Sequence, residues 1–242
     1  MKLNNYPKVI FKTSTKEDEN MSFLHGEIDD VIKNRKSFLQ TCGLSLEDCV
    51  VMSVEHSDTI MIVTKKDRGR GTLSRENLLT AEALVTDEKN VILFLLTADC
   101  FPVAFFDPAQ DVIALAHLGW KPTHIKLAQK IINVLVMKYK SDPKDIIVSF
   151  GPGIQKESYV LKEIAQMNSP EWKPYIQKQE DGSVSIDLVG YNNEQLLASG
   201  IIKENIETTK IDTATSEKYF SHYREVRTGE KTGRFATILT MK

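Results

Sequence analysis

Three apolar runs in the middle of the chain constrain its fold more than any other feature. They are 91-VILFLLT-97, 102-PVAFFD-107 and 112-VIALAH-117. Their apolar residues are continuous and do not alternate with polar ones, which is typical of β-strands buried on both faces. A layer of such strands needs other elements packed above it and below it, so these runs predict a layered protein with a large core.

The rest of the chain supplies elements for those outer layers. Helical spacing of apolar residues predicts helices over 27–43, 123–140 and 189–202, and apolar runs predict further strands over 49–64 (broken around 56-HSD-58), 145–154 and 235–240. Thr123 suits the N-cap of the second helix. Because no linker, repeat or low-complexity tract divides the chain, we expect one α+β domain over residues 1–242, with mixed β-sheets flanked by helices.

Charge and cysteine content exclude several classes of protein. Lys and Arg number 31 against 33 Asp and Glu, a formal charge of −2, so no basic excess indicates a nucleic-acid partner. The N-terminus has no apolar signal segment, and no run approaches the roughly 18 apolar residues of a membrane helix. Three cysteines are an odd number, which argues against a disulfide framework. We therefore expect a cytoplasmic protein without a membrane partner.

Chemically active side chains interrupt or end the buried strands. Cys100 follows Asp99 in the break after the first apolar run, His117 ends the third run, and His56 lies at the break in 49–64. A lone buried cysteine is more often a small hydrophobic residue. However, one thiolate and two imidazoles also suit a catalytic zinc ion, which keeps a fourth position open for water. Spacing alone leaves both interpretations open.

Several motifs in fixed order favour the metal site. They are 82-EALVT-86, 97-TADCFPV-103, 116-AHLGWKPT-123, 151-GPGI-154 and 232-TGRFA-236. The chain thereby resembles a bacterial family known as laccase-domain proteins, multicopper polyphenol oxidoreductases or YfiH-type purine nucleoside phosphorylases. The resemblance spans roughly residues 50–238, and its most specific part joins TADCxP to H-x-GW.

The resemblance implies a metal shell of two histidines and one cysteine. The histidine of the family's QVHG-like segment corresponds to His56 in 53-SVEHS-57, the cysteine of TADCxP to Cys100, and the histidine of HAGW to His117. The implied cofactor is Zn²⁺, with copper as the less favoured metal. His25 and His124 are then not ligands.

The chain departs from the family pattern around the expected substrate pocket. Val54 and Ser57 replace the glutamine and glycine of QVHG, Lys121 and Pro122 stand in place of Arg-Gly, Gly153 replaces the cysteine of GPCIG, 11-FKTST-15 lacks the family's FxTRxGG pattern, and the C-terminal segment has extra residues before TGR. The expected ligands are kept while the pocket has changed.

The activity that the resemblance implies is chemistry on purine nucleosides. It comprises phosphorolysis of adenosine, inosine, guanosine or methylthioadenosine, and deamination of adenosine, so the implied partners are a small-molecule nucleoside and phosphate. Asp99 is our candidate for moving the proton, although an aspartate in a turn equally well caps backbone amides. Lys121, Arg224 and Arg234 are the cations available for phosphate, and Lys121 and Arg234 are the substrate-binding candidates.

Other readings of the same residues remain open. A multicopper oxidase consumes many imidazoles, and five histidines in the whole chain argue against one. Cys100 and His117 could instead be the nucleophile and base of a hydrolase or amidase acting on peptidoglycan precursors. A non-catalytic metal-binding domain is the third reading. Stoichiometric zinc separates the metal readings from the hydrolase, and the sequence carries no prediction of the oligomeric state.

Overall fold

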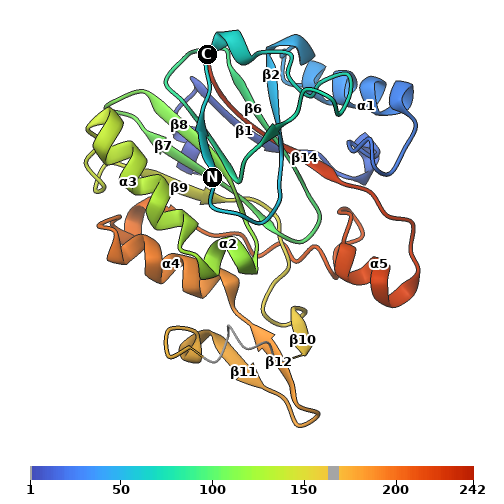
Figure 1. Cartoon of the computed structure of the whole chain (residues 1–242), viewed down its shortest axis with the longest axis vertical. Helices are drawn as coiled ribbons and strands as arrows, with labels where there is room; N and C mark the ends of the chain where they lie inside the picture. The colour runs from blue at the N-terminus through green and yellow to red at the C-terminus, as the bar shows by residue number, and fades with distance from the viewer. Residues whose placement is uncertain (1, 163–168) are drawn as a thin grey trace.

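Two large β-sheets form the centre of the computed structural model, which describes residues 2–162 and 169–242 (Figure 1). The five-stranded sheet has the order β1-β14-β6-β2-β4, with β1 Val9–Thr13, β14 Phe235–Met241, β6 Ile92–Thr97, β2 Cys49–Ser53 and β4 Leu79–Thr80. The six-stranded sheet has the order β13-β9-β7-β8-β5-β3, with β13 Ile206–Glu207, β9 Ile147–Phe150, β7 Phe101–Asp107, β8 Val112–Leu118, β5 Ala83–Thr86 and β3 Ile60–Ile62. Both sheets mix parallel and antiparallel pairs.

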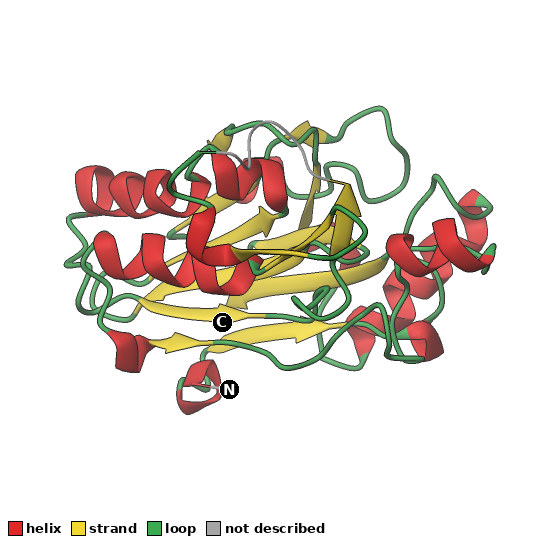
Figure 2. Cartoon of the chain, turned by 90° about the horizontal axis from the view of Figure 1, so that it is seen from below, coloured by secondary structure: helices red, strands yellow, loops and turns green. Residues whose placement is uncertain are grey.

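Helices cover the outer faces of the two sheets. The helices are α1 Ile28–Gln40, α2 Trp120–His124, α3 Leu127–Tyr139, α4 Leu188–Ala198 and α5 His222–Thr228, and short 3-10 helices span Lys2–Asn5, Lys16–Asp18, Leu46–Asp48, Lys65–Asp67, Lys173–Tyr175 and Lys203–Asn205. In Figure 1, α1 lies on one side of the strands, and α3 and α4 lie on the other. Figure 2 shows helices on both sides of the strands. The longest described helices, α1 and α3, have 13 residues, too few to cross a membrane.

Three apolar clusters hold these layers together. One lies between the sheets and joins Leu93 of β6 to Phe106 of β7 and Leu115 of β8. The second packs α3 and α4 on the six-stranded sheet, and the third packs α1 on the five-stranded sheet. The order helix, sheet, sheet, helix buries both faces of the central strands and confirms the α+β prediction with mixed sheets flanked by helices.

One predicted helix is wrong in detail. The pattern over 123–140 belongs to two helices, α2 and α3, separated at Lys126, whose φ is 61°. Thr123 is not an N-cap. It lies inside α2 and is buried, where its hydroxyl and carbonyl accept hydrogen bonds from Asn192 and Gln195 of α4. Thr123 therefore joins α2 to α4 and does not cap the start of a helix.

A small sheet projects from the layered body. Its strands are β10 Val160–Lys162, β11 Ile176–Lys178 and β12 Ser183–Ile186, in the order β10-β12-β11 (Figure 1). These short strands, β1 and α5 were not predicted from the sequence. All three cysteines, Cys42, Cys49 and Cys100, are free thiols.

Candidate metal centre

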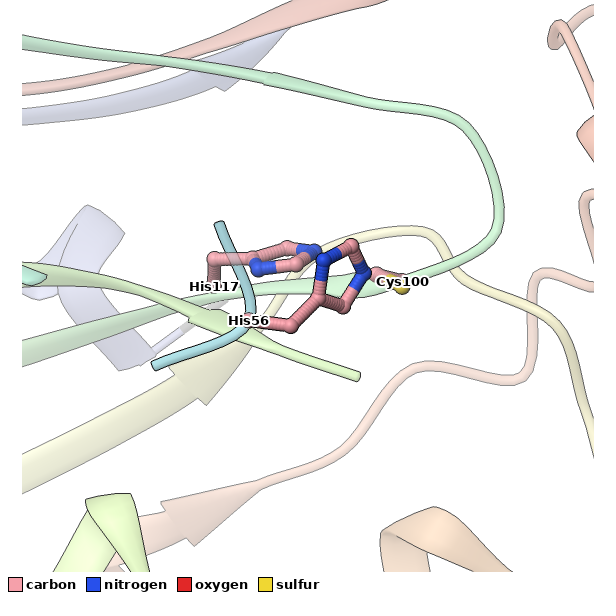
Figure 3. A group of neighbouring side chains, drawn as sticks. All are labelled: His56, Cys100 and His117. Carbon is pink, nitrogen blue, oxygen red and sulfur yellow. The ribbon is translucent and has the colours of Figure 1, made fainter. Parts of the chain in front are cut away.

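Strand pairing brings His56, Cys100 and His117 together although 61 positions separate the first from the last. His117 lies in β8 and pairs with Pro102 of β7, so the loop before β7 carries Cys100 to the same end of the sheet. His56 enters from the loop between β2 and β3 (Figure 3). One ligand atom from each of the three lies within 4.8 Å of the others.

A buried carboxylate, Glu82, organises both histidines. Its Oε2 lies 2.7 Å from Nδ1 of His117, and its Oε1 accepts hydrogen bonds from the backbone amides of Glu55 at 2.6 Å and Ser57 at 3.1 Å. Those amides flank His56, whose φ of 60° is costly for a residue other than glycine. Glu82 therefore orients one imidazole directly and fixes the strained loop that presents the other.

From the sequence, Glu82 is only the first residue of the motif 82-EALVT-86, and no role at the metal site was predicted for it. An acid at the start of a strand ordinarily faces water, but Glu82 is fully buried. Burial raises the pKa of its carboxyl, and the hydrogen bonds from His117, Ser57 and Glu55 outweigh that effect and hold the pKa below its usual value. The charged form is the one that can accept a hydrogen bond from Nδ1–H and leave Nε2 of His117 free to bind a metal.

The thiol and imidazole of the site shift each other's protonation. Burial raises the pKa of the Cys100 thiol, but the charge on His117 and hydrogen bonds from His117 and His56 outweigh it and bring the pKa down to about 6. Burial lowers the pKa of His117, and the Cys100 thiolate and Glu82 more than offset that and raise it to about 9. At neutral pH Cys100 is thus a thiolate, the form that binds metals and attacks electrophiles.

Gly119 makes room for that thiolate. A Cβ on Gly119 would lie 2.7 Å from Sγ of Cys100 and 3.8 Å from Cε1 of His117. Its φ of −90° is open to any residue, so the backbone conformation does not require a glycine here. Close approach to the site is the reason that H-x-GW needs glycine here.

Asp99 lies beside Cys100 but its carboxylate turns toward other loops. Its Oδ1 accepts a hydrogen bond from the Thr213 hydroxyl at 2.7 Å, and its Oδ2 accepts one from the backbone amide of Tyr223 at 2.7 Å. The φ of Asp99 is 85°. These contacts favour the capping interpretation of Asp99, in which it positions the segment that carries Cys100, and its role in proton transfer stays a prediction.

The three cations expected to meet phosphate differ in their surroundings. Arg224 is fully occupied: it donates to the carbonyls of residues 213, 214, 216 and 219 and pairs with Glu230, which makes it a structural residue. Lys121 is exposed on α2, with its ammonium group 5.7 Å from the centre of the Trp120 ring. Arg234 is partly buried and lines a cavity together with Val54.

Two departures from the family pattern have local explanations. A Cβ on Gly153 would lie 2.4 Å from Cδ1 of Phe101, so the Phe101 ring fills the space that a cysteine side chain would need. Pro122 is buried in the first turn of α2, where helices leave backbone amides unpaired and proline is tolerated. Neither change disturbs the ends of β7 and β8 that carry Cys100 and His117.

Tyr159 is a neighbour of the site that sequence reasoning missed. Burial, then the charges of Cys100 and Asp99, raise the pKa of its phenol. The hydroxyl of Tyr159 therefore stays protonated at neutral pH. No local sequence signal marked it, because Tyr159 lies in the loop that leads into β10, far along the chain from the metal-binding motifs.

The histidines outside the group give a direct test of the ligand set. His124 accepts a hydrogen bond at Nδ1 from the indole of Trp172 at 3.0 Å, and among the described residues it is not part of the metal-binding group. We expect His124→Ala and His25→Ala to keep parental zinc content, measured by elemental analysis of folded protein, whereas His56→Ala loses zinc. Loss of zinc in His124→Ala alone would show that the wrong histidine was chosen.

The donor set fits a zinc ion. Bonds of about 2.0–2.3 Å in a tetrahedral shell put ligand atoms roughly 3.3–3.8 Å apart, so the observed limit of 4.8 Å requires only small side-chain movements. Three protein ligands leave one position for water or substrate. His56 is exposed, so the group of three side chains is open to solvent on its side.

Comparisons with known proteins agree with the motifs. The family model described as multi-copper polyphenol oxidoreductase laccase matches residues 13–242. Purine nucleoside phosphorylase YlmD of Bacillus subtilis is 29% identical over 225 residues, which cover 90% of this chain and 80% of that protein. The protein of the same name from Geobacillus stearothermophilus is 31% identical over 220 residues, covering 87% of this chain and 78% of that one.

A solved structure has the same fold over nearly the whole chain. The crystal structure of YfiH, a hypothetical protein of Bacillus licheniformis, matches with a TM-score of 0.92 at 27% identity and covers 99% of this chain and 95% of that one. The resemblance predicted from TADCxP and H-x-GW is confirmed by the family match and by this structure.

Proposed function

The chain belongs to the family described as multi-copper polyphenol oxidoreductase laccase, and we propose that it is a zinc-dependent purine nucleoside phosphorylase. The observation that carries the proposal is the convergence of His56, Cys100 and His117, held in place by Glu82. The names of the YlmD relatives supply the reaction class.

In this proposal His56, Cys100 and His117 hold the metal. A zinc ion bound there supplies a Lewis acid and lowers the pKa of a coordinated water. Zn²⁺ is preferred over copper because three Cys and His ligands with a fourth position left for water are the shell of a catalytic zinc ion, although copper binds most such sites more tightly. Deamination of adenosine is the finer part of the proposal, and the same three residues serve it.

The chain's own groups bind and orient the substrates. Arg234 offers a guanidinium for phosphate from the cavity next to β2, and exposed Lys121 offers a second cation from α2. The protonated phenol of Tyr159 is a donor for the base or sugar. Asp99, through Thr213 and Tyr223, holds the loops that border this region.

Polyphenol oxidation by several coppers is disfavoured by the number of ligands. Among the residues that the structure describes, one group of three His, Cys, Asp or Glu ligands could hold a metal. A multicopper centre needs many more imidazoles than the two found there. The word laccase in the family description is therefore not the activity we propose for this chain.

A Cys–His hydrolase is the second candidate, favoured by one observation. The lowered pKa of Cys100 and the raised pKa of His117 describe a thiolate–imidazolium pair, which is the arrangement of cysteine nucleophiles. His56 would then orient the pair or stabilise an oxyanion. A Cys–His metal site without its ion also contains a thiolate–imidazolium pair, so this observation alone does not exclude the zinc site.

A nucleoside panel on zinc-replete protein tests the proposed function. Adenosine, inosine, guanosine and methylthioadenosine are incubated with and without phosphate, and free base, ribose 1-phosphate and ammonia are measured beside zinc content. We expect base release that requires phosphate. Bound zinc with no turnover of any nucleoside would favour a non-catalytic metal-binding domain, and zinc-free protein that hydrolyses amides would favour the hydrolase.

A further inference from the structure

A cavity lined by three arginines lies where β2 leads into the His56 loop. Arg35, Arg75 and Arg234 form its charged wall, and Ser22 and Ser53 add hydroxyls. Among its lining residues, all in the described part of the chain, none is acidic. Its volume of about 130 Å³ is several times the roughly 30 Å³ that one water occupies in the liquid.

Arg35 is the most unusual of the three, since only 1% of it is exposed. Its Nε donates to the carbonyl of Met21 at 2.9 Å, and its Nη1 donates to the carbonyls of Gly71 at 2.8 Å and Thr72 at 3.2 Å. In the described ranges, its Nη2 has no protein acceptor and keeps some exposure at the cavity, and no carboxylate forms an ion pair with Arg35. Burial lowers its pKa to about 10, so it is still charged at neutral pH.

A buried cation without a counter-charge is costly. The rings of Phe23 and Phe94, with centroids 4.2 Å and 5.3 Å from Arg35 Cζ, offset part of that cost through cation–π contact. They add no hydrogen-bond acceptor for Nη2. An anion in the cavity would provide both the counter-charge and the acceptor.

The other two guanidinium groups also have free donors. Arg234 uses Nη1 for the Thr232 hydroxyl at 3.1 Å and the Gly233 carbonyl at 2.7 Å, and it has no further side-chain partner in the part of the chain described. Arg75 is exposed at the rim and makes no hydrogen bond or ion pair with any described residue. By contrast, Arg68 and Arg70 of the same loop pair with Asp48 and Asp67, respectively.

We propose that this cavity is a phosphate-binding subsite in which Arg35, Arg75 and Arg234 hold a phosphoryl group. Guanidinium groups bind phosphate oxygens with paired, charge-assisted hydrogen bonds. The group comes either from free phosphate or from the phosphate ester of a nucleotide. The three arginines by themselves indicate a site for an oxyanion. That this oxyanion is phosphate rests on the proposed function.

The position of the cavity connects it to the metal centre. Val54, which lines it, precedes His56 by two residues. Arg234, which also lines the cavity, is partly buried and lies within range of the negative charges of Glu225, Asp99 and Cys100. Phosphate held here would lie next to a nucleoside bound at the metal.

Equilibrium binding of inorganic phosphate and of adenosine 5′-monophosphate at constant ionic strength tests the subsite. Titration calorimetry on parent, Arg75→Gln and the matched control Arg70→Gln needs no turnover. Because Arg75 is exposed, its variant keeps the fold. We expect the affinity for phosphate to fall at least tenfold in Arg75→Gln and to stay within about twofold in Arg70→Gln.

The outcomes separate the subsite from the proposed function. Binding of adenosine monophosphate without binding of free phosphate, lost in Arg75→Gln, supports the subsite with a nucleotide as the source. No binding of either, parental affinity in Arg75→Gln, or an equal loss in Arg70→Gln overturns it. Intact phosphate binding in a protein that cleaves no nucleoside would overturn the proposed function and leave the subsite standing.

Discussion

Cys100→Ser is expected to lose zinc and base release together, with turnover of adenosine falling by more than about 100-fold. Serine keeps the size of the side chain but remains a neutral hydroxyl at pH 7, so it cannot replace the thiolate as a ligand. The measurement is zinc per chain by elemental analysis, beside the rate of adenine release with saturating phosphate. Thermal unfolding of the zinc-free proteins verifies that the variant is folded.

Cys42→Ser is the matched control, because Cys42 is a partly exposed free thiol away from the site. It should keep parental zinc and rate. If Cys100→Ser instead binds stoichiometric zinc and is still inactive, the thiolate acts on the substrate and the ligand assignment fails.

Glu82→Gln is the second change with a large expected effect. Its amide oxygen can still accept hydrogen bonds from the amides of Glu55 and Ser57, which leaves its amino group to donate to Nδ1 of His117. That donor favours the tautomer with its proton on Nε2 and so opposes metal binding there. We expect zinc affinity to fall about 10–100-fold, measured by competition with a chelator.

A purely structural role for Glu82 predicts a different result. In that case Glu82→Gln, which preserves the backbone contacts, would bind zinc like the parent, and only Glu82→Ala would be impaired. A control on the same strand pair is Thr86→Ser, at the far end of β5 from the site. It should leave zinc affinity unchanged.

The layered core could be predicted because burial on both faces leaves a continuous apolar run. The runs at β6, β7 and β8 showed this directly, and α1 and α4 showed helical spacing. The break at Lys126 was hidden because a lysine in a left-handed conformation has no signature in an apolar pattern. Strands β10, β11 and β12 were missed because each has only three or four residues and because β10 and β11 have no buried residue.

The metal ligands could be proposed from residue chemistry and motif order, but their support could not. The pairing of Pro102 with His117 and the bonds of Glu82 depend on strand register, which one sequence does not give. The burial of Arg35 could not be predicted either. In the helical pattern of α1 it looks like any surface arginine, but the fold buries it under the loop at Gly71. Contacts between distant segments decide these roles.

Adenine release from adenosine and phosphate, followed in one preparation before chelation, after full removal of zinc and after its return, tests the central claim most directly. The proposed mechanism predicts that activity disappears with the metal and returns with stoichiometric Zn²⁺, and that zinc protects Cys100 from alkylation. Activity that survives complete chelation but is abolished when Cys100 is alkylated would contradict it and establish the cysteine nucleophile.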